Sequence, residues 1–179
     1  MSEDEIHKKW EDHPMLKPEI EKVVVNLCVG KSGEPLEKAV KVLKEITDHV
    51  PCKRKAKQSI RDFGIRKGEP IACIVTLRRQ NAINFLNKVL PVVDKKISGK
   101  SFDKNGSFSF GIKEHIEIQG VKYDPDTGIF GMDVNVAMIR PGYRVKNKRR
   151  EKAKIGSKHL LTPEESMVFI KDTLGVEIV

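Results

Sequence analysis

The chain has 179 residues, of which 39% are hydrophobic, and this combination excludes a disordered tail and predicts one folded domain. Its 34 Lys and Arg residues against 25 Asp and Glu residues give a net charge of +9, which predicts a polyanionic partner, either nucleic acid or an acidic membrane surface. The three cysteines form no C-x-x-C pair, so neither a zinc site nor a disulfide framework is expected. The first residues are charged and no apolar run approaches the roughly 20 residues of a membrane helix, so we expect an intracellular protein.

Alternating and helical patterns define the elements expected in the first half of the chain. Residues 1–18 are polar and predict a short helix or a flexible arm, and a strand follows over 19–29. One side of this strand carries Val23, Val25, Leu27 and Val29, and the other carries Lys22, Val24, Asn26 and Cys28, as in a sheet covered on one face. We expect a helix from 36 until Pro51, a basic edge strand within 52–59, and a second one-sided strand over 71–79.

The second half predicts more strands between two helices. A helix is expected over 81–97, with Pro91 kinking or splitting it. Short strands are expected around 108–110 and 116–118, a turn at 123–128 and a longer strand over 129–139. The last helix begins with a capping box at Thr162 and ends at Gly175. This order predicts an α+β fold, a two-layer sandwich in which helices pack on one face of a mostly antiparallel sheet.

We find no motif with a catalytic or metal-binding spacing. Gly30-Lys31-Ser32 is similar to the end of a phosphate-binding loop, but Val25 stands where that motif needs a glycine. The five histidines fall at no metal-ligand spacing, and the serine hydrolase and zinc protease signatures are missing. We therefore predict no catalytic residue, no metal and no cofactor. An RNA-modifying or RNA-processing enzyme with groups scattered along the sequence stays the alternative.

The segment 144–161 is a predicted basic loop. It holds eight cations against one carboxylate, Glu151, so most of the excess charge of the chain lies here. We predict phosphate contacts by Arg144, Lys146, Lys148, Arg149 and Arg150. The alternative is a solvated, mobile loop. Binding to a membrane is not expected, because no apolar face accompanies the charges.

The polar side of the two one-sided strands is a candidate RNA surface. If the strands are neighbours, Asn26, Thr76 and Arg78 project from the same uncovered face, near Lys55 and Lys57. Amide and hydroxyl groups bind base edges and ribose hydroxyls, and cations neutralise phosphates. The face lacks exposed aromatic residues, which favours recognition of RNA shape over base stacking. The alternative is an ordinary solvated sheet face.

A loop between the two strands, 62–68, carries apolar and cationic side chains between glycines. Phe63, Ile65, Arg66 and Lys67 could reach a second RNA or a protein from its tip. The alternative is a hairpin loop folded onto its own sheet.

Six stretches, in this order and spacing, resemble one known family. They are IEKVVVNLCVGKSG, KAKQSIRDFGIRKGEPIACIVTLR, GSFSFGIKEHIEI, YDPDTGIFGMD, RPGYRV and IGSKHLLTPEES. Together they resemble the universal large-subunit ribosomal protein L five, over nearly the whole chain. The run NKRREKAK before IGSKH is similar to the archaeal and eukaryotic form.

The resemblance implies a non-enzymatic ribosomal protein in the cytoplasm, forming a single domain over 1–179. It implies that the sheet binds 5S rRNA and anchors it in the central protuberance, and that large-subunit rRNA is a further partner. The residues implied for 5S rRNA are Asn26, His49, Lys55, Lys57, Thr76 and Arg78. The loop over 60–68, with Arg61, Phe63, Ile65, Arg66 and Lys67, is implied to approach the peptidyl-site tRNA. Neighbouring ribosomal proteins, including a small-subunit bridge partner, are the other implied partners.

One position departs from the family pattern. Many relatives carry Gly-Gln before the basic edge strand, where this chain has Asp48 and His49. We hypothesise that the His49 ring replaces the glutamine in an RNA contact, or that the contact is lost. RNA binding would then be weaker or mildly pH-dependent.

Overall fold

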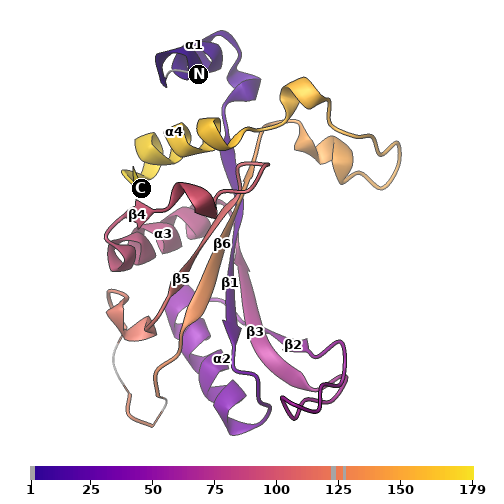
Figure 1. Ribbon diagram of the computed structural model, residues 1–179, viewed down its shortest axis with the longest axis vertical. Coiled ribbons are helices and arrows are strands. Elements are labelled where there is room, and N and C mark those ends of the chain that lie inside the picture. Colours follow the sequence, from indigo (N-terminus) through magenta and orange to yellow (C-terminus); the bar gives the residue numbers. More distant parts are fainter. Residues whose placement is uncertain (1–2, 122–123, 127) are drawn as a thin grey trace.

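A five-stranded sheet forms the centre of the computed structural model, which describes residues 3–121, 124–126 and 128–179 (Figure 1). In spatial order its strands are β2 (Cys52–Lys55), β3 (Pro70–Leu77), β1 (Glu19–Cys28), β6 (Met132–Ile139) and β5 (Phe108–Ile112). Each strand is antiparallel to its neighbour. Helices α2 (Glu34–Thr47) and α3 (Arg79–Val89) pack on one face of this sheet. The predicted α+β fold is confirmed.

The period-two pattern of β1 decides which face of the sheet is covered. Val23, Val25 and Leu27 are almost fully buried against the helices. Each such side chain stabilises the fold by about 1.5–3 kcal/mol through its removal from water. Helix α2 supplies the facing stripe, made of Leu36, Ala39, Leu43 and Ile46. Among the described residues, no helix packs on the other face, which stays open.

The helix expected over 81–97 is shorter in the structure. Helix α3 ends at Val89, a 3-10 segment follows over Leu90–Val93, and residues Lys96–Ile97 form the short strand β4. Pro91 breaks the α-helix because it has no backbone N–H, as predicted, and the left-handed φ angles of Asp94 and Lys95 then turn the chain away. Strand β4 pairs in parallel with β7 (Glu177–Ile178), a terminal strand that no pattern in the sequence predicted.

The prediction of a strand around 116–118 is wrong. His115–Glu117 form a 3-10 turn instead. The buried His115 ring accepts a hydrogen bond from the Phe130 N–H through Nδ1 at 3.2 Å, and the backbone N–H of His115 donates to the Phe130 carbonyl at 3.0 Å. These bonds replace strand pairing. The turn expected at 123–128 falls partly outside the described residues.

Residues 1–18, where a helix or an arm was expected, contain helix α1 (Glu3–Asp12). Its Ile6 and Trp10 are buried against Val168 of α4 (Pro163–Leu174), in a small cluster separate from the main core. Figure 1 shows α1 and α4 together at the end of the sheet where β1 begins. The N-terminal helix is therefore docked on the last helix.

The predicted start and end of α4 are confirmed. The Thr162 hydroxyl accepts a hydrogen bond from the Glu165 N–H and the Glu165 carboxylate accepts one from the Thr162 N–H, which is the expected capping box. Gly175 ends the helix with a φ of 63°. Across the described residues, no helix has the length and apolar character needed to cross a bilayer.

Candidate nucleic-acid interface

The open face of the sheet brings Asn26 and Thr76 onto adjacent strands, as predicted. Strand β1 pairs with β3 so that Val24 stands opposite Thr76 and Asn26 stands opposite Ile74. Asn26 and Thr76 are thus diagonal neighbours on one face, a separation that a single nucleotide spans. Thr76 is exposed and Asn26 is half-buried. Both polar groups point toward solvent from the side of the sheet that α2 and α3 leave uncovered.

The edge strand β2 lines this face with cations. Arg54 stands opposite Ala72, and Lys55 stands opposite Pro70 after a register shift between the two. Lys53 stands opposite the buried Cys73 and pairs with Glu37 of α2, so it belongs to the helical side. Arg54 was missing from the predicted site. A strand of one cysteine and three cations, all exposed, has no hydrophobic alternation, so only its register against β3 identifies the residue that faces out.

Lys57 lies beyond the sheet, at the start of the loop. Between it and β2, Ala56 is buried and exchanges backbone hydrogen bonds with Glu69 and Gly68 at 2.8 and 2.9 Å. Lys57 is exposed at this closure of the loop. Lys57 was predicted to lie near the open face, but in the structure it belongs to the loop that follows β2.

Arg78 stands at the point where β3 ends and α3 begins. It is the N-cap residue of α3, and its side chain is 57% exposed. Its Nη1 lies 3.8 Å from Glu21 Oε1, a loose surface ion pair that contributes at most about 1 kcal/mol. The guanidinium is therefore held near the end of the open face yet stays available to a phosphate.

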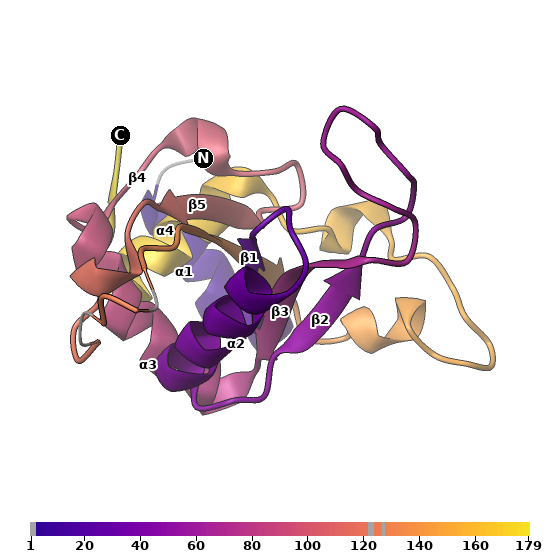
Figure 2. The ribbon, with the colours of Figure 1, turned by 90° about the horizontal axis from the view of Figure 1, so that it is seen from below.

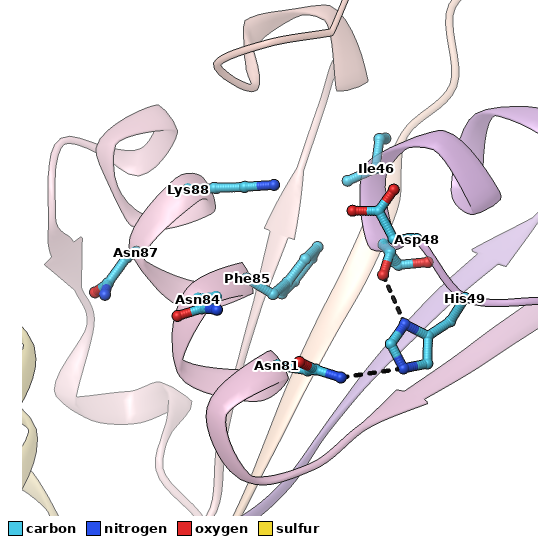
Figure 3. Close-up of a pocket in the computed structure, with 9 residues that line it drawn as sticks. Ile46, Asp48, His49, Asn81, Asn84, Phe85, Asn87 and Lys88 are labelled. Carbon is cyan, nitrogen blue, oxygen red and sulfur yellow. Dashed lines mark hydrogen bonds between the residues drawn. The ribbon is translucent and has the colours of Figure 1, made fainter.

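His49 does not lie on the open face with the other predicted residues. Figure 3 shows its ring in a pocket between the end of α2 and the first turns of α3. The ring lies 2.8 Å from the Thr47 carbonyl oxygen through Nδ1 and 3.3 Å from the Asn81 amide nitrogen through Nε2. Because the carbonyl only accepts hydrogen bonds, Nδ1 carries the proton. Both ring nitrogens of His49 are therefore engaged within the helical layer, away from Asn26 and Thr76, and its contact with RNA stays a prediction.

The loop over 60–68 is a closed hairpin with an exposed tip. Ile60 and Ile65 exchange backbone hydrogen bonds at 2.9 and 3.1 Å, and Gly64 makes the turn with a φ of 65°. Phe63 is 71% exposed, and Arg61, Arg66 and Lys67 are exposed around it. The loop extends beyond the sheet next to β2 (Figures 1 and 2).

Glu69 fixes the base of this loop. Its carboxylate accepts hydrogen bonds from the Ser32 hydroxyl and from the Arg66 N–H, the latter at 3.0 Å. These two bonds, the Ser32 bond first, hold the pKa of Glu69 below its usual value. The carboxylate is therefore charged at neutral pH, and it ties the loop to the turn after β1.

The two ends of the predicted basic loop are joined by hydrogen bonds, and most of the part between them is exposed. The Tyr143 hydroxyl accepts a hydrogen bond from the Leu161 N–H at 2.9 Å and donates one to the His159 carbonyl at 3.2 Å. Lys146 Nζ lies 5.0 Å from the centre of the Tyr143 ring. The predicted phosphate-contact side chains, Arg144, Lys146, Lys148, Arg149 and Arg150, are all exposed. Figure 2 shows this segment and the loop over 60–68 extending on the same side of the molecule.

A buried ion pair joins the end of β6 to α4 at the base of the basic loop. Arg140 and Glu165 are 3% and 5% exposed, and the guanidinium contacts the Glu165 carboxylate directly. Arg140 also donates to the Leu160 carbonyl at 3.0 Å. Loss of one partner from a buried pair leaves an uncompensated charge, which typically costs about 3–5 kcal/mol.

His115 lines a pocket and has an altered pKa. Burial lowers the pKa of its imidazole. It shares a hollow with Lys41, Glu45 and Asp124, but the described lining residues include no hydroxyl or thiol. With Nδ1 accepting the Phe130 N–H, the ring has a structural role. Among the described residues, no group of three or more His, Cys, Asp or Glu side chains is placed to bind a metal.

Comparison with known proteins agrees with this architecture. The family model described as "Ribosomal protein L5" matches residues 13–66, and the model for the C-terminus of the same ribosomal protein family matches residues 70–169. The large ribosomal subunit protein uL5 of Pyrobaculum aerophilum is 54% identical over 166 residues, which cover 93% of each chain. The uL5 proteins of Aeropyrum pernix and Sulfolobus acidocaldarius are 49% and 47% identical, over 98% and 93% of this chain and 92% and 94% of their own. The chain therefore belongs to the uL5 family of large-subunit ribosomal proteins.

Proposed function

We propose that this protein is a structural, non-enzymatic component of the large ribosomal subunit that binds 5S rRNA through the open face of its sheet. The observation that carries the proposal is the open face itself. It places an amide and a hydroxyl, from Asn26 and Thr76, beside a cationic edge made by Arg54 and Lys55. Amide and hydroxyl groups suit ribose and base edges, and cations suit phosphates. Arg78 adds a further cation at the end of β3.

The two projecting loops suit other partners in the ribosome. The tip of the loop over 60–68, with Arg61, Phe63, Ile65, Arg66 and Lys67, approaches the peptidyl-site tRNA. The basic loop contacts phosphates of the large-subunit rRNA, and neighbouring proteins include a small-subunit bridge partner. The protein anchors 5S rRNA in the central protuberance and works in the cytoplasm, on the ribosome.

The whole chain acts as a single domain in this proposal. The N-terminal family model covers β1 and β2, and the C-terminal one covers β3, β5 and β6. Because β1 lies between β3 and β6, the two matched parts share one sheet and one core. Neither half contains a complete sheet of its own.

The proposal can be tested by replacing cations of β2 that lie on opposite faces of the sheet. We expect Arg54→Ala and Lys55→Ala each to weaken binding of 5S rRNA and to reduce the slope of log affinity against log salt by about 0.7–0.9, the value for one lost phosphate contact. Lys53→Ala removes the same charge from the same strand but on the helical side, so it should leave the slope unchanged. Equal effects of all three variants would indicate only nonspecific attraction of a polycation and would count against a site on the open face.

A further inference from the structure

The open face continues over β6 and β5 with polar side chains outside the proposed RNA contacts. Asp133 and Asn135 of β6 and Ser109 of β5 are exposed there. Asp133 stands opposite Asn26, and Asn135 stands between Val24 and Ser109. Two shallow hollows open over this part of the sheet, and Asn135 and Ser109 line both. Within the described parts of the chain, the side chains of Asp133 and Asn135 make no hydrogen bond or ion pair.

Gly111 lacks a side chain at a position of the open face where the fold has room for one. It lies inside β5, opposite Asp133, in a ladder without a bulge, and its φ is outside the left-handed region. A Cβ at this position would lie 3.9 Å from Asp133 Oδ1, with no other atom closer than 4 Å. Neither backbone conformation nor packing therefore requires glycine here. A glycine in a strand interior weakens the strand, and it often marks the close approach of a ligand.

We propose that Gly111, Asp133, Asn135 and Ser109 form a second half of the RNA site, which takes ribose hydroxyls and base edges in a minor groove. This inference rests on the proposed function and adds the part of the RNA that lies over β5 and β6. An ionised carboxylate only accepts hydrogen bonds and repels phosphates, so Asp133 fits donors, namely 2′-hydroxyl groups and base amino groups. The shallow minor groove of an RNA helix presents these groups.

The distribution of charge across the sheet agrees with that orientation. Arg54 and Lys55 lie on β2, and Asp133 lies on β6, three strands away. Neighbouring strands are about 4.8 Å apart, so roughly 14 Å separates the cationic edge from the carboxylate. An RNA helix laid across the face sets a phosphate backbone against β2 and its groove against β6.

The test uses Gly111→Val and Asp133→Asn, with Asp12→Asn on α1 as a control that removes the same charge from a distant exposed site. The ligands are 5S rRNA and the same RNA transcribed with 2′-fluoro pyrimidines, which keep the helix but cannot donate a hydrogen bond. We expect Gly111→Val to bind 5S rRNA on the order of tenfold more weakly, because its side chain blocks the groove. Its melting temperature should not fall, since valine suits an exposed strand position.

For Asp133→Asn we expect a smaller loss of affinity on 2′-fluoro substitution than the unchanged protein shows, because the uncharged amide oxygen accepts a hydrogen bond from a 2′-hydroxyl more weakly than the carboxylate does. Asp12→Asn should behave as the unchanged protein. If the protein selects 5S rRNA over tRNA but Gly111→Val binds normally and Asp133→Asn shows the full 2′-fluoro loss, the inference is overturned. If the unchanged protein does not select 5S rRNA, the proposed function fails first and this extension fails with it.

Discussion

His115 links the stability of the protein to pH through one buried ring. Burial lowers its pKa in the folded state, so the unfolded chain, whose histidine titrates near 6.5, binds the proton more readily. The contribution of the neutral His115 ring to the free energy of unfolding is therefore fully present above about pH 6.5. It is lost as the pH falls through the lower pKa of His115 in the folded state. Protonation of Nδ1 also removes the hydrogen bond from the Phe130 N–H.

We expect His115→Asn to reduce this pH dependence, because the amide oxygen accepts the Phe130 N–H but does not titrate. The measurement is the free energy of unfolding in urea at pH 7.5, 6.5 and 5.5 for both proteins. The unchanged protein should lose more stability than the variant between the first and the last of these values. Parallel curves for the two proteins would show that His115 is not the titrating group.

At the scale of single residues, the sequence predicted those side chains whose direction follows from hydrophobic alternation. Asn26 and Thr76 stand between buried valine and leucine positions, so their exposure on the open face followed from the period of two. Arg54 was missed because β2 is exposed throughout and shows no hydrophobic alternation. The place of the His49 ring did not follow from the sequence, because it depends on contacts with Thr47 and with Asn81, which is 32 residues away. No local pattern contains that contact.

The loop over 60–68 and the open face of the sheet are separate elements. Reversing the charge of Arg66 in the loop should therefore affect translation without affecting 5S rRNA binding. We expect Arg66→Glu to leave 5S rRNA affinity intact and to slow translation, because the tip repels the tRNA backbone. Arg66→Lys keeps the charge and serves as the matched control. The measurements are 5S rRNA affinity and the elongation rate of ribosomes that carry each variant. Loss of 5S rRNA binding in Arg66→Glu would place the loop in the 5S rRNA site and refute this division.

The junction between β6 and α4 depends on the buried pair of Arg140 and Glu165. We expect Glu165→Gln to lower the free energy of unfolding by about 3–5 kcal/mol, because Arg140 is left buried without its counter-charge. The double variant Arg140→Met with Glu165→Leu should recover part of this loss, since it leaves no buried charge. The capping box and the hydrogen bond to Leu160 are not recovered. Urea unfolding of the three proteins measures this, and a loss below about 1 kcal/mol in Glu165→Gln would contradict it.

Elements were predictable from the sequence where local signals and tertiary contacts agree. The capping box of α4, its terminal glycine and the break at Pro91 all lie within a few residues of the boundary that they set. The strands β4 and β7 are two residues each and exist only because they pair across about 80 residues of chain. The expected strand at 116–118 failed for a related reason. Its apolar residues alternate, but the contact between His115 and Phe130 determines the local conformation.

In the molecule as a whole, the cations and the carboxylate of the open face lie on different strands of the sheet. The sheet buries one face under helices, and its open face runs from the cations of β2 to the carboxylate of β6. The two cationic loops extend on the side where β2 lies (Figure 2). Composition predicted a polyanionic partner, but only the register of the strands relates the cations to Asn26 and Thr76. We infer that this arrangement distinguishes a selective RNA site from a simple polycation.

We propose that the open face of the sheet selects 5S rRNA over other RNAs. The most direct measurement is the affinity of the purified protein for 5S rRNA at several salt concentrations, with excess tRNA as competitor. We predict tight binding that weakens with salt and persists when tRNA is present, because base-edge and ribose contacts add to the phosphate term. Binding that tRNA abolishes would contradict a selective site on the open face and leave only the nonspecific attraction of a basic protein for RNA.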